Sequence, residues 1–232
     1  MHWRRLGGIL TLLLALVGSA SAARGQCPRL QNVPPLVITL NLVEPKITYH
    51  HDVDLFGLPK LERASERPPP GWTMLGLTKI SDSLRTSFKF ATVALADGRV
   101  CVWLTEVNAQ LGDPVMNVYV AAEYAPGTCE YKTILDHENT HVRFNLETLR
   151  DWMPSVKAAL TETAKRRFPA IFATQPSDDA LRERLLENLY SVFDLMNDDM
   201  RKRNASIDTP ENYKRTAALC RDWSRHGLAL DH

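Results

Sequence analysis

The first half of the chain alternates apolar and polar residues with the period of two that is typical of β-strands. This pattern predicts strands over residues 36–43, 46–51, 73–80, 86–95, 100–110 and 115–124. Turn-forming sequences occupy residues 96–98 and 111–114 between the last three runs, and such sequences favour short antiparallel connections. We therefore expect an antiparallel β-meander within residues 36–124.

The second half follows the 3.6-residue period of amphipathic helices. It predicts helices over residues 128–152, 155–168, 177–203 and 210–224, with Pro154 expected to end the first of them. The third helix carries one apolar stripe, formed by Leu181, Leu185, Leu189, Val192, Met196 and Met200. Strands followed by helices predict one α+β domain over residues 23–232, β-rich over 36–124 and helical over 128–226.

The first predicted helix contains the pattern HExxH, from His137 to His141. Because one helical turn takes about 3.6 residues, His137 and His141 stand on one face and can bind the same metal ion. Zinc (Zn²⁺) is the metal that this pattern favours, and Glu138 beside it can act as a general base toward water. All three residues lie in or beside the apolar arc, where polar groups need partners. The alternative is a pair of core-edge histidines hydrogen-bonded to the backbone.

A catalytic zinc site needs a third protein ligand and one open position. Asp208 lies in the interruption between the last two predicted helices, from which its carboxylate can reach inward. Its alternative role is the N-cap of the last helix, just ahead of Pro210. Asp199 and His226 are weaker candidates. The adjacent His50 and His51 would point to opposite faces of a strand, so we expect them to be structural.

The N-terminal residues have the three parts of a secretory signal peptide. Arg4 and Arg5 are positive, residues 6–17 are apolar, and Ala20-Ser21-Ala22 is a small-residue cleavage pattern. We predict a signal peptide over residues 1–22, cleavage after Ala22, and a secreted or periplasmic protein with no membrane span after cleavage. A lipoprotein attached at Cys27 and an uncleaved N-terminal anchor are the alternatives.

The four cysteines of the chain, Cys27, Cys101, Cys129 and Cys220, are an even number with no CxxC pair. In an exported protein such a set predicts two disulfides rather than a cysteine metal site. The expected hairpin would bring Cys101 near the chain leading to Cys129. We therefore predict the pairs Cys101–Cys129 and Cys27–Cys220.

Lysine and arginine number 28 against 27 acidic residues, so the formal net charge is +1. The local basic runs, residues 165–167 and 201–203, lie near predicted helix ends, where cations are favourable. No basic patch of the kind that phosphate binding needs is visible in the sequence, which argues against a nucleic-acid partner.

The order of strands, HExxH helix and helical remainder resembles the zincin metallopeptidases. More narrowly, the export signal, Cys101-Val102-Trp103 in a strand and Ile207-Asp208-Thr209 after a long helix resemble bacterial predicted secreted zinc-dependent proteases. That family follows its aspartate with a threonine and a histidine-glycine pair. Here Tyr213 stands about where the histidine would be.

The resemblance implies a zincin-like fold with zinc on His137, His141 and a third ligand. Asp208 is the expected third ligand. Glu187 is the alternative, because its distance of 46 residues from His141 is typical of zincins that use a downstream glutamate, although it points away from the leucine stripe. By analogy with zincins, Tyr213 would donate a hydrogen bond to the oxyanion; its other role is to pack the last helix.

Two functions are consistent with these residues. The first is an exported zinc-dependent hydrolase, a metallopeptidase that cleaves peptide or amide bonds in the cell envelope with Glu138 as general base. Its substrates would be peptides or proteins, cell-wall peptides among them. The second is a non-catalytic envelope protein that binds partners or serves as a structural component. Glu138 favours the enzyme, because a structural zinc site has no need of this carboxylate and normally recruits a fourth ligand.

Overall fold

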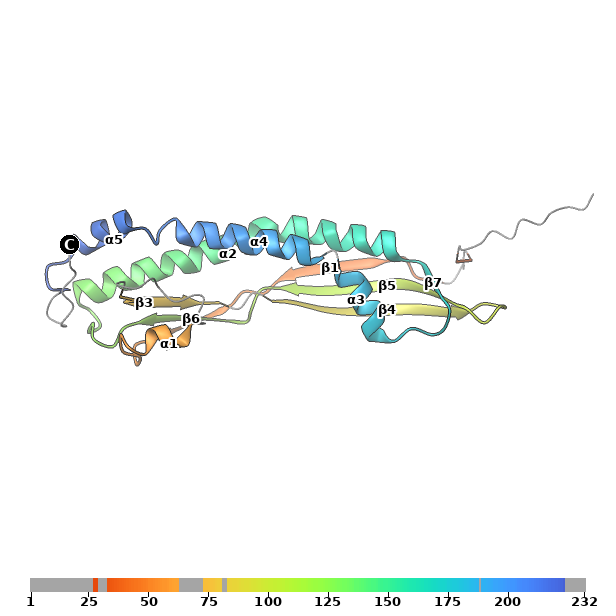
Figure 1. Ribbon diagram of the computed structural model, residues 1–232, viewed down its shortest axis with the longest axis horizontal. Helices are drawn as coiled ribbons and strands as arrows, with labels where there is room; N and C mark the ends of the chain where they lie inside the picture. Colours follow the sequence, from red (N-terminus) through yellow and green to blue (C-terminus); the bar gives the residue numbers. More distant parts are fainter. Residues whose placement is uncertain (1–26, 29–32, 63–72, 81–82, 188, 224–232) are drawn as a thin grey trace, which may run out of the picture.

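The computed structural model describes residues 27–28, 33–62, 73–80, 83–187 and 189–223. The predicted signal peptide, residues 1–22, and the candidate ligand His226 lie outside the described residues. Within them the chain is a mixed α/β structure with two sheets and five helices. Figure 1 shows an elongated molecule in which the two sheets follow one another along the long axis.

Three stretches of the chain, residues 37–50, 76–94 and 100–120, each supply one strand to each sheet. The first sheet has the order β1-β5-β4, with β7 also paired to β5, and the second has the order β2-β6-β3. The strands are β1 Val37–Leu42, β2 Lys46–His50, β3 Gly76–Lys79, β4 Leu84–Ala94, β5 Val100–Leu111, β6 Val115–Val120 and β7 Ala170–Phe172.

The expected antiparallel meander is wrong in most of its pairings. Strands β4 and β5 do form the predicted hairpin, but β1 pairs parallel to β5 and β2 pairs parallel to β6. The turn expected at residues 111–114 does not reverse the chain. Gly112 has φ +106° and Asp113 Oδ1 accepts a hydrogen bond from the Val115 N–H, and β6 then continues beyond β5 in the second sheet. A parallel pairing needs a connection that brings the chain back, and the run through β3 and β4, antiparallel to β6 and β5, supplies it.

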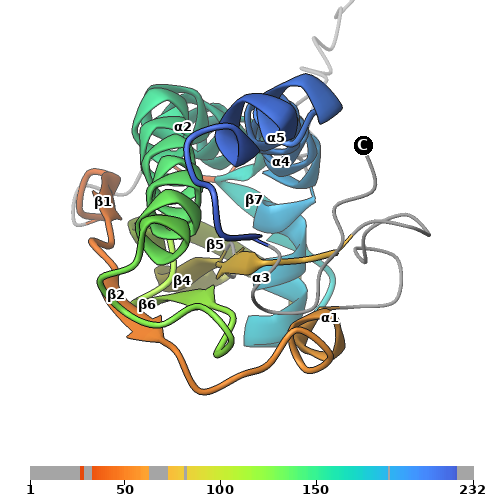
Figure 2. The same ribbon diagram turned by 90° about the vertical axis from the view of Figure 1, so that its left-hand side faces the viewer.

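Helix α2 (Cys129–Arg167) has 39 residues and a length of about 58 Å. It lies along both sheets (Figures 1 and 2). The predicted end before Pro154 is wrong, and the two helices expected over 128–152 and 155–168 are one. Pro154 is exposed, so the backbone hydrogen bond that it cannot donate is missing from the solvent-facing side of the helix. The burial of Val156 and Leu160 beyond it outweighs the cost of a proline in a helix.

The remaining helices are α1 Leu58–Leu61, α3 Asp178–Leu186, α4 Leu189–Ala205 and α5 Pro210–Ala217. The single helix expected over 177–203 is therefore two, α3 and α4, and the last helix ends earlier than predicted. Both α3 and α4 bury members of the predicted stripe: Leu181, Leu185, Leu189, Met196 and Met200. The change of direction between them lets α3 cover the first sheet while α4 packs beside α2 (Figure 2).

The cysteines form two disulfides, as predicted, but with different partners. Cys27 pairs with Cys101, and Cys129 pairs with Cys220. The predicted pairing of Cys101 with Cys129 is wrong. Residues 101–120 run in one direction through β5 and β6, so residues 101 and 120 lie about 60 Å apart. Among the described helices, none combines the length and apolar character that a membrane crossing requires.

Candidate metal centre

The first half of α2 carries the predicted metal-binding residues. The helix begins after Thr128, whose side chain accepts a hydrogen bond from the Tyr131 N–H. His137 and His141, one turn apart, stand at the side of α2 that meets the loop between α4 and α5. Their rings lie 4.8 Å apart between centroids, in an edge-to-face arrangement. The backbone of a single helix thus fixes the spacing of both imidazoles.

Asp208 completes a group of three possible metal ligands with His137 and His141. Its Oδ1 lies 3.0 Å from His137 Nε2 and 3.3 Å from His141 Nε2, and the two Nε2 atoms are 3.1 Å apart. Ligand atoms about 2.0–2.1 Å from a tetrahedral zinc ion are about 3.3–3.4 Å apart. The three side chains therefore fit a metal ion that they would share, with one position left for water or substrate.

The loop between α4 and α5 turns the Asp208 carboxylate toward the histidines. The N-cap of α5 is Thr209, whose Oγ1 accepts a hydrogen bond from the Asn212 N–H at 3.2 Å. Asn212 Nδ2 in turn donates to the carbonyl of Ile207 at 2.7 Å. Thr209 thus fills the capping role that was the alternative for Asp208.

The other candidate carboxylates lie elsewhere. Glu187 ends α3, is 63% exposed and accepts a hydrogen bond from Arg167 Nη2 at 2.6 Å. Arg167 is 26 residues beyond His141 on α2, about 39 Å along the helix. Asp199 accepts a hydrogen bond from Trp152 Nε1 at 2.9 Å. The structure brings neither carboxylate into the group that could hold a metal ion.

Two asparagines that the sequence patterns did not single out orient His141. Its Nδ1 donates to Asn204 Oδ1 at 2.7 Å, while Asn204 Nδ2 donates to Asn145 Oδ1 and to the Met200 carbonyl. These amide contacts direct the Asn204 oxygen toward His141, so the proton of the neutral imidazole sits on Nδ1. Nε2, which faces Asp208, is then the nitrogen that would bind a metal ion once it is deprotonated.

Glu138 is 5% exposed and faces strand β3. Thr78 Oγ1 lies 2.8 Å from its Oε2 and 3.0 Å from its backbone carbonyl. At Gly76 a Cβ atom would approach Glu138 Oε1 to 2.6 Å and Ile134 to 2.7 Å, so only glycine leaves room for this carboxylate. Sequence reasoning missed both β3 residues; the only hint was a glycine inside a strand pattern.

Charges within the group shift the pKa values of its members. Burial raises the pKa of Glu138, and the nearby His141 and His137 only partly oppose it. Burial also acts to raise the pKa of Asp208, but hydrogen bonds with His137, His141 and Tyr213 hold it well below its usual range. Burial lowers the pKa of His141, yet Asp208 and Glu138 raise it more. Asp208 is therefore ionised, with its Oδ1 directed at both imidazoles.

Tyr213 reaches the same group from α5. Its hydroxyl donates to Asp208 Oδ1 at 2.8 Å, and its ring centroid lies 5.5 Å from that of His137. Tyr213 is 37% exposed, and the partial burial of its phenol together with the neighbouring Asp208 carboxylate raises the pKa of that phenol, so it is a protonated donor. A cavity of about 260 Å³ opens beside His137 between α2 and α5, lined in part by Thr133, Thr140 and Thr216.

His50 and His51 lie outside this group. His50 Nε2 is 2.9 Å from Asn117 Oδ1, and the ring stacks on Tyr119. His51 Nε2 donates to the Tyr124 carbonyl at 2.7 Å. Both histidines thus have protein partners, which agrees with the structural role expected from the sequence.

No protein-family model matches the chain, and nothing among curated proteins or solved structures is similar enough to match it. Function must therefore be inferred from the chemistry of the site.

Proposed function

We propose that the protein is an exported zinc-dependent metallopeptidase of the zincin type that cleaves peptide or amide bonds. The observation that carries the proposal is the convergence of His137, His141 and Asp208 beside the buried carboxylate of Glu138. Two imidazoles and one carboxylate are the ligand set that suits catalytic zinc, whereas magnesium and calcium prefer oxygen ligands alone. The two disulfides support export, since they persist in oxidising compartments.

Zinc, when bound, polarises a substrate carbonyl and makes water a better nucleophile at neutral pH. The chain's own residues perform the proton transfers. Glu138 takes a proton from the attacking water and delivers it to the leaving amine, so that one water and one amide give a carboxylic acid and an amine. Thr78 orients the Glu138 carboxylate for both steps through a hydrogen bond, and Gly76 leaves room for it.

Tyr213 is our candidate for the residue that stabilises the oxyanion. Its phenol is a protonated donor whose hydroxyl already lies at the ligand Asp208. A shift of this donor from Asp208 to the substrate oxygen would add a hydrogen bond where negative charge develops. Peptides and proteins, including the peptides of cell walls, are the proposed substrates.

The test separates metal binding from hydrolysis. Purified wild-type protein should contain about one zinc per chain by elemental analysis, while His141→Ala and Asp208→Ala should bind zinc so weakly that they are purified without it. Glu138→Gln should keep the zinc but lose peptide hydrolysis by about 10²–10⁴-fold, because the amide cannot accept a proton. The matched control is Glu162→Gln, an exposed glutamate on the same helix, which should change neither.

Two further variants test the individual assignments. Glu187→Ala should keep zinc, and a zinc-free Glu187→Ala protein would overturn the choice of Asp208. Tyr213→Phe should lower kcat by about 10²–10³-fold, and an unchanged kcat would retire the oxyanion role. A wild-type protein that binds zinc but hydrolyses no peptide would favour the non-catalytic alternative.

A further inference from the structure

The third ligand lies on a segment that is closed by a disulfide. We define the ligand segment as residues 206–220, which carry Asp208 and Tyr213. At one end it leaves α4, which packs on α2 and contributes Asn204 to the site. At the other end Cys220 is bonded to Cys129, the first residue of α2. The segment therefore lies across the half of α2 that carries both histidines, with an attachment to α2 at each side.

The ligand segment has little packing of its own. None of the residues of α5, all of which the structure describes, is buried. Leu219 next to the disulfide is 68% exposed. Apolar contact comes from Ala217, which packs on the cluster around Tyr124 and Trp223. An amphipathic helix is normally held by its buried face, and α5 lacks one.

Polar contacts beside Cys220 add to the attachment at this end. Thr133 Oγ1 lies 3.3 Å from Cys220 Sγ, and the Asp222 N–H donates to the buried Glu130 at 3.1 Å. Toward the site, the contacts that hold the segment are those of Asp208 and Tyr213 with the metal-binding group itself. Such contacts cannot position the ligand before the group has formed.

We propose that Cys129 and Cys220 are positioning residues of the metal centre, whose disulfide keeps Asp208 and Tyr213 at the two histidines. This inference rests on the proposed function, since it assumes that Asp208 is a ligand. A segment attached at both ends keeps its carboxylate at a high effective concentration near the imidazoles. With the disulfide removed, the Cys220 end of the segment loses its covalent link to α2, and the third ligand is present for a smaller fraction of the time.

The second disulfide provides a matched control. Cys27–Cys101 joins the start of the described chain to β5, next to the Ala170 carbonyl and far from the histidines. Zinc affinity is measured by competition with a chelator for Cys129→Ser/Cys220→Ser and for Cys27→Ser/Cys101→Ser. The first pair should bind zinc about 10–100-fold more weakly, the range for loss of a group that positions a ligand. The second pair should keep the wild-type affinity.

A double-mutant cycle with Asp208→Ala separates positioning from general stability. If the disulfide acts through Asp208, its removal should cost no further zinc affinity once Asp208 is alanine. An equal loss in both backgrounds would overturn the proposal, as would wild-type affinity in the folded Cys129→Ser/Cys220→Ser protein. Should that variant fail to fold, the folded Cys27→Ser/Cys101→Ser protein, which keeps only the Cys129–Cys220 disulfide, is used instead. A phosphine reduces this disulfide to two thiols, with water supplying the oxygen of the phosphine oxide. The thiols are then alkylated.

Hydrogen exchange gives a readout that does not depend on zinc. Amides of residues 211–217 should exchange faster in Cys129→Ser/Cys220→Ser than in wild type, while amides of α4 keep their protection. A wild-type protein without zinc affinity would refute the proposed function but leave this measurement intact. Unchanged exchange over residues 211–217 would then overturn the positioning role by itself.

Discussion

The two halves of α2 bury different kinds of residues although they belong to one continuous helix. The first half, residues 129–148, buries two apolar side chains, Ile134 and Val142, and four polar ones: Glu130, Glu138, Asn145 and Thr148. The second half, residues 149–167, buries mainly apolar ones: Leu149, Val156, Leu160 and Ala164, with Thr163 among them. Each of these four polar groups has a hydrogen-bond partner: Glu130 with the Asp222 N–H, Glu138 with Thr78, Asn145 with Asn204, and Thr148 with the Phe144 carbonyl. Burying polar groups gains less stability than burying apolar ones, so their concentration in one half of the helix supports the site proposed there.

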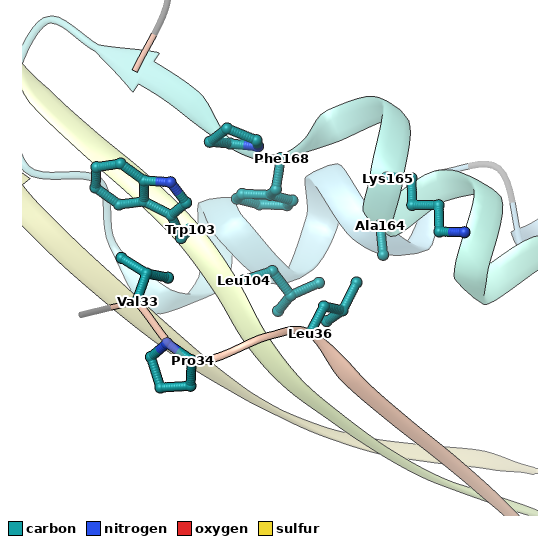
Figure 3. A pocket seen from close by; sticks show the side chains of 9 residues that line it. Val33, Pro34, Leu36, Trp103, Leu104, Ala164, Lys165 and Phe168 are labelled. Atoms are coloured by element: carbon teal, nitrogen blue, oxygen red, sulfur yellow. The ribbon is translucent and has the colours of Figure 1, made fainter. Parts of the chain in front are cut away.

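The cavities at the two ends follow the same division. The one beside His137 has hydroxyl, carboxylate and amide groups in its lining. At the other end, a cavity of about 260 Å³ lies between β5 and the end of α2, and Trp103, Leu104 and Phe168 line it (Figure 3). Lys165 directs its amine away from these side chains (Figure 3). The second half of α2 thus belongs to the main apolar core, and we infer that it serves as a scaffold for the first half.

The largest effect should come from crowding the functional end. Gly76→Ala would place a methyl group 2.6 Å from Glu138 Oε1, so the carboxylate must move. We expect hydrolysis to fall by about 10²–10⁴-fold, as expected for loss of a general base, while zinc content stays at the wild-type level. Lys79→Ala, which truncates an exposed side chain of the same strand, is the control. Equal peptide turnover by Gly76→Ala and wild type would contradict the role assigned to this contact.

An apolar truncation in the second half should lower stability without touching the metal. Leu160 is 2% exposed in the core beneath α2. Leu160→Ala should lower the free energy of unfolding by about 2–5 kcal/mol, measured by urea titration, and leave zinc binding of the folded protein unchanged. Leu195→Ala, at a leucine that is 59% exposed, should change it by less than about 0.5 kcal/mol. Loss of zinc affinity in folded Leu160→Ala would mean that the two halves are coupled.

A polar truncation in the first half should do the reverse. Asn204→Ala removes the acceptor that orients His141 and the donor to Asn145. Zinc affinity, measured by chelator competition, should fall by about 10–100-fold. Asn108→Ala, on the exposed face of β5, is the control. Wild-type affinity in Asn204→Ala would show that His141 is oriented by other contacts.

The sequence predicted the parts of the structure that depend on neighbouring residues. The HExxH spacing predicted that His137 and His141 share one helical face. The interruption after the long helix predicted that Asp208 reaches them, and the structure brings the three side chains together. Strand pairing was mispredicted, because the partner of a strand depends on the path of the connections between strands. The disulfide pairing failed with it, since it assumed that β6 folds back on β5. Gly76 and Thr78 were missed because their importance comes from contact with Glu138, which is distant in the sequence.

The last prediction concerns the continuity of α2 at Pro154, within its second half. Pro154 lies within α2 and lacks the N–H that would bond to the carbonyl four residues earlier. A proline at an exposed helical position costs about 3 kcal/mol relative to alanine, and its restriction of the unfolded chain returns part of that. Pro154→Ala should therefore raise the free energy of unfolding by about 2 kcal/mol, with Ser155→Ala as the exposed neighbouring control.

Urea titration of both variants, together with their zinc affinities, gives the result a structural meaning. A gain in stability with unchanged zinc affinity would mean that the proline is unfavourable in α2. The helix would then continue through Pro154 only because the residues buried on both sides of it stabilise the helical backbone. A loss of stability would mean that the helix needs the altered backbone at Pro154 to follow both sheets. In that case the proline is part of what aligns the metal-binding half with its scaffold.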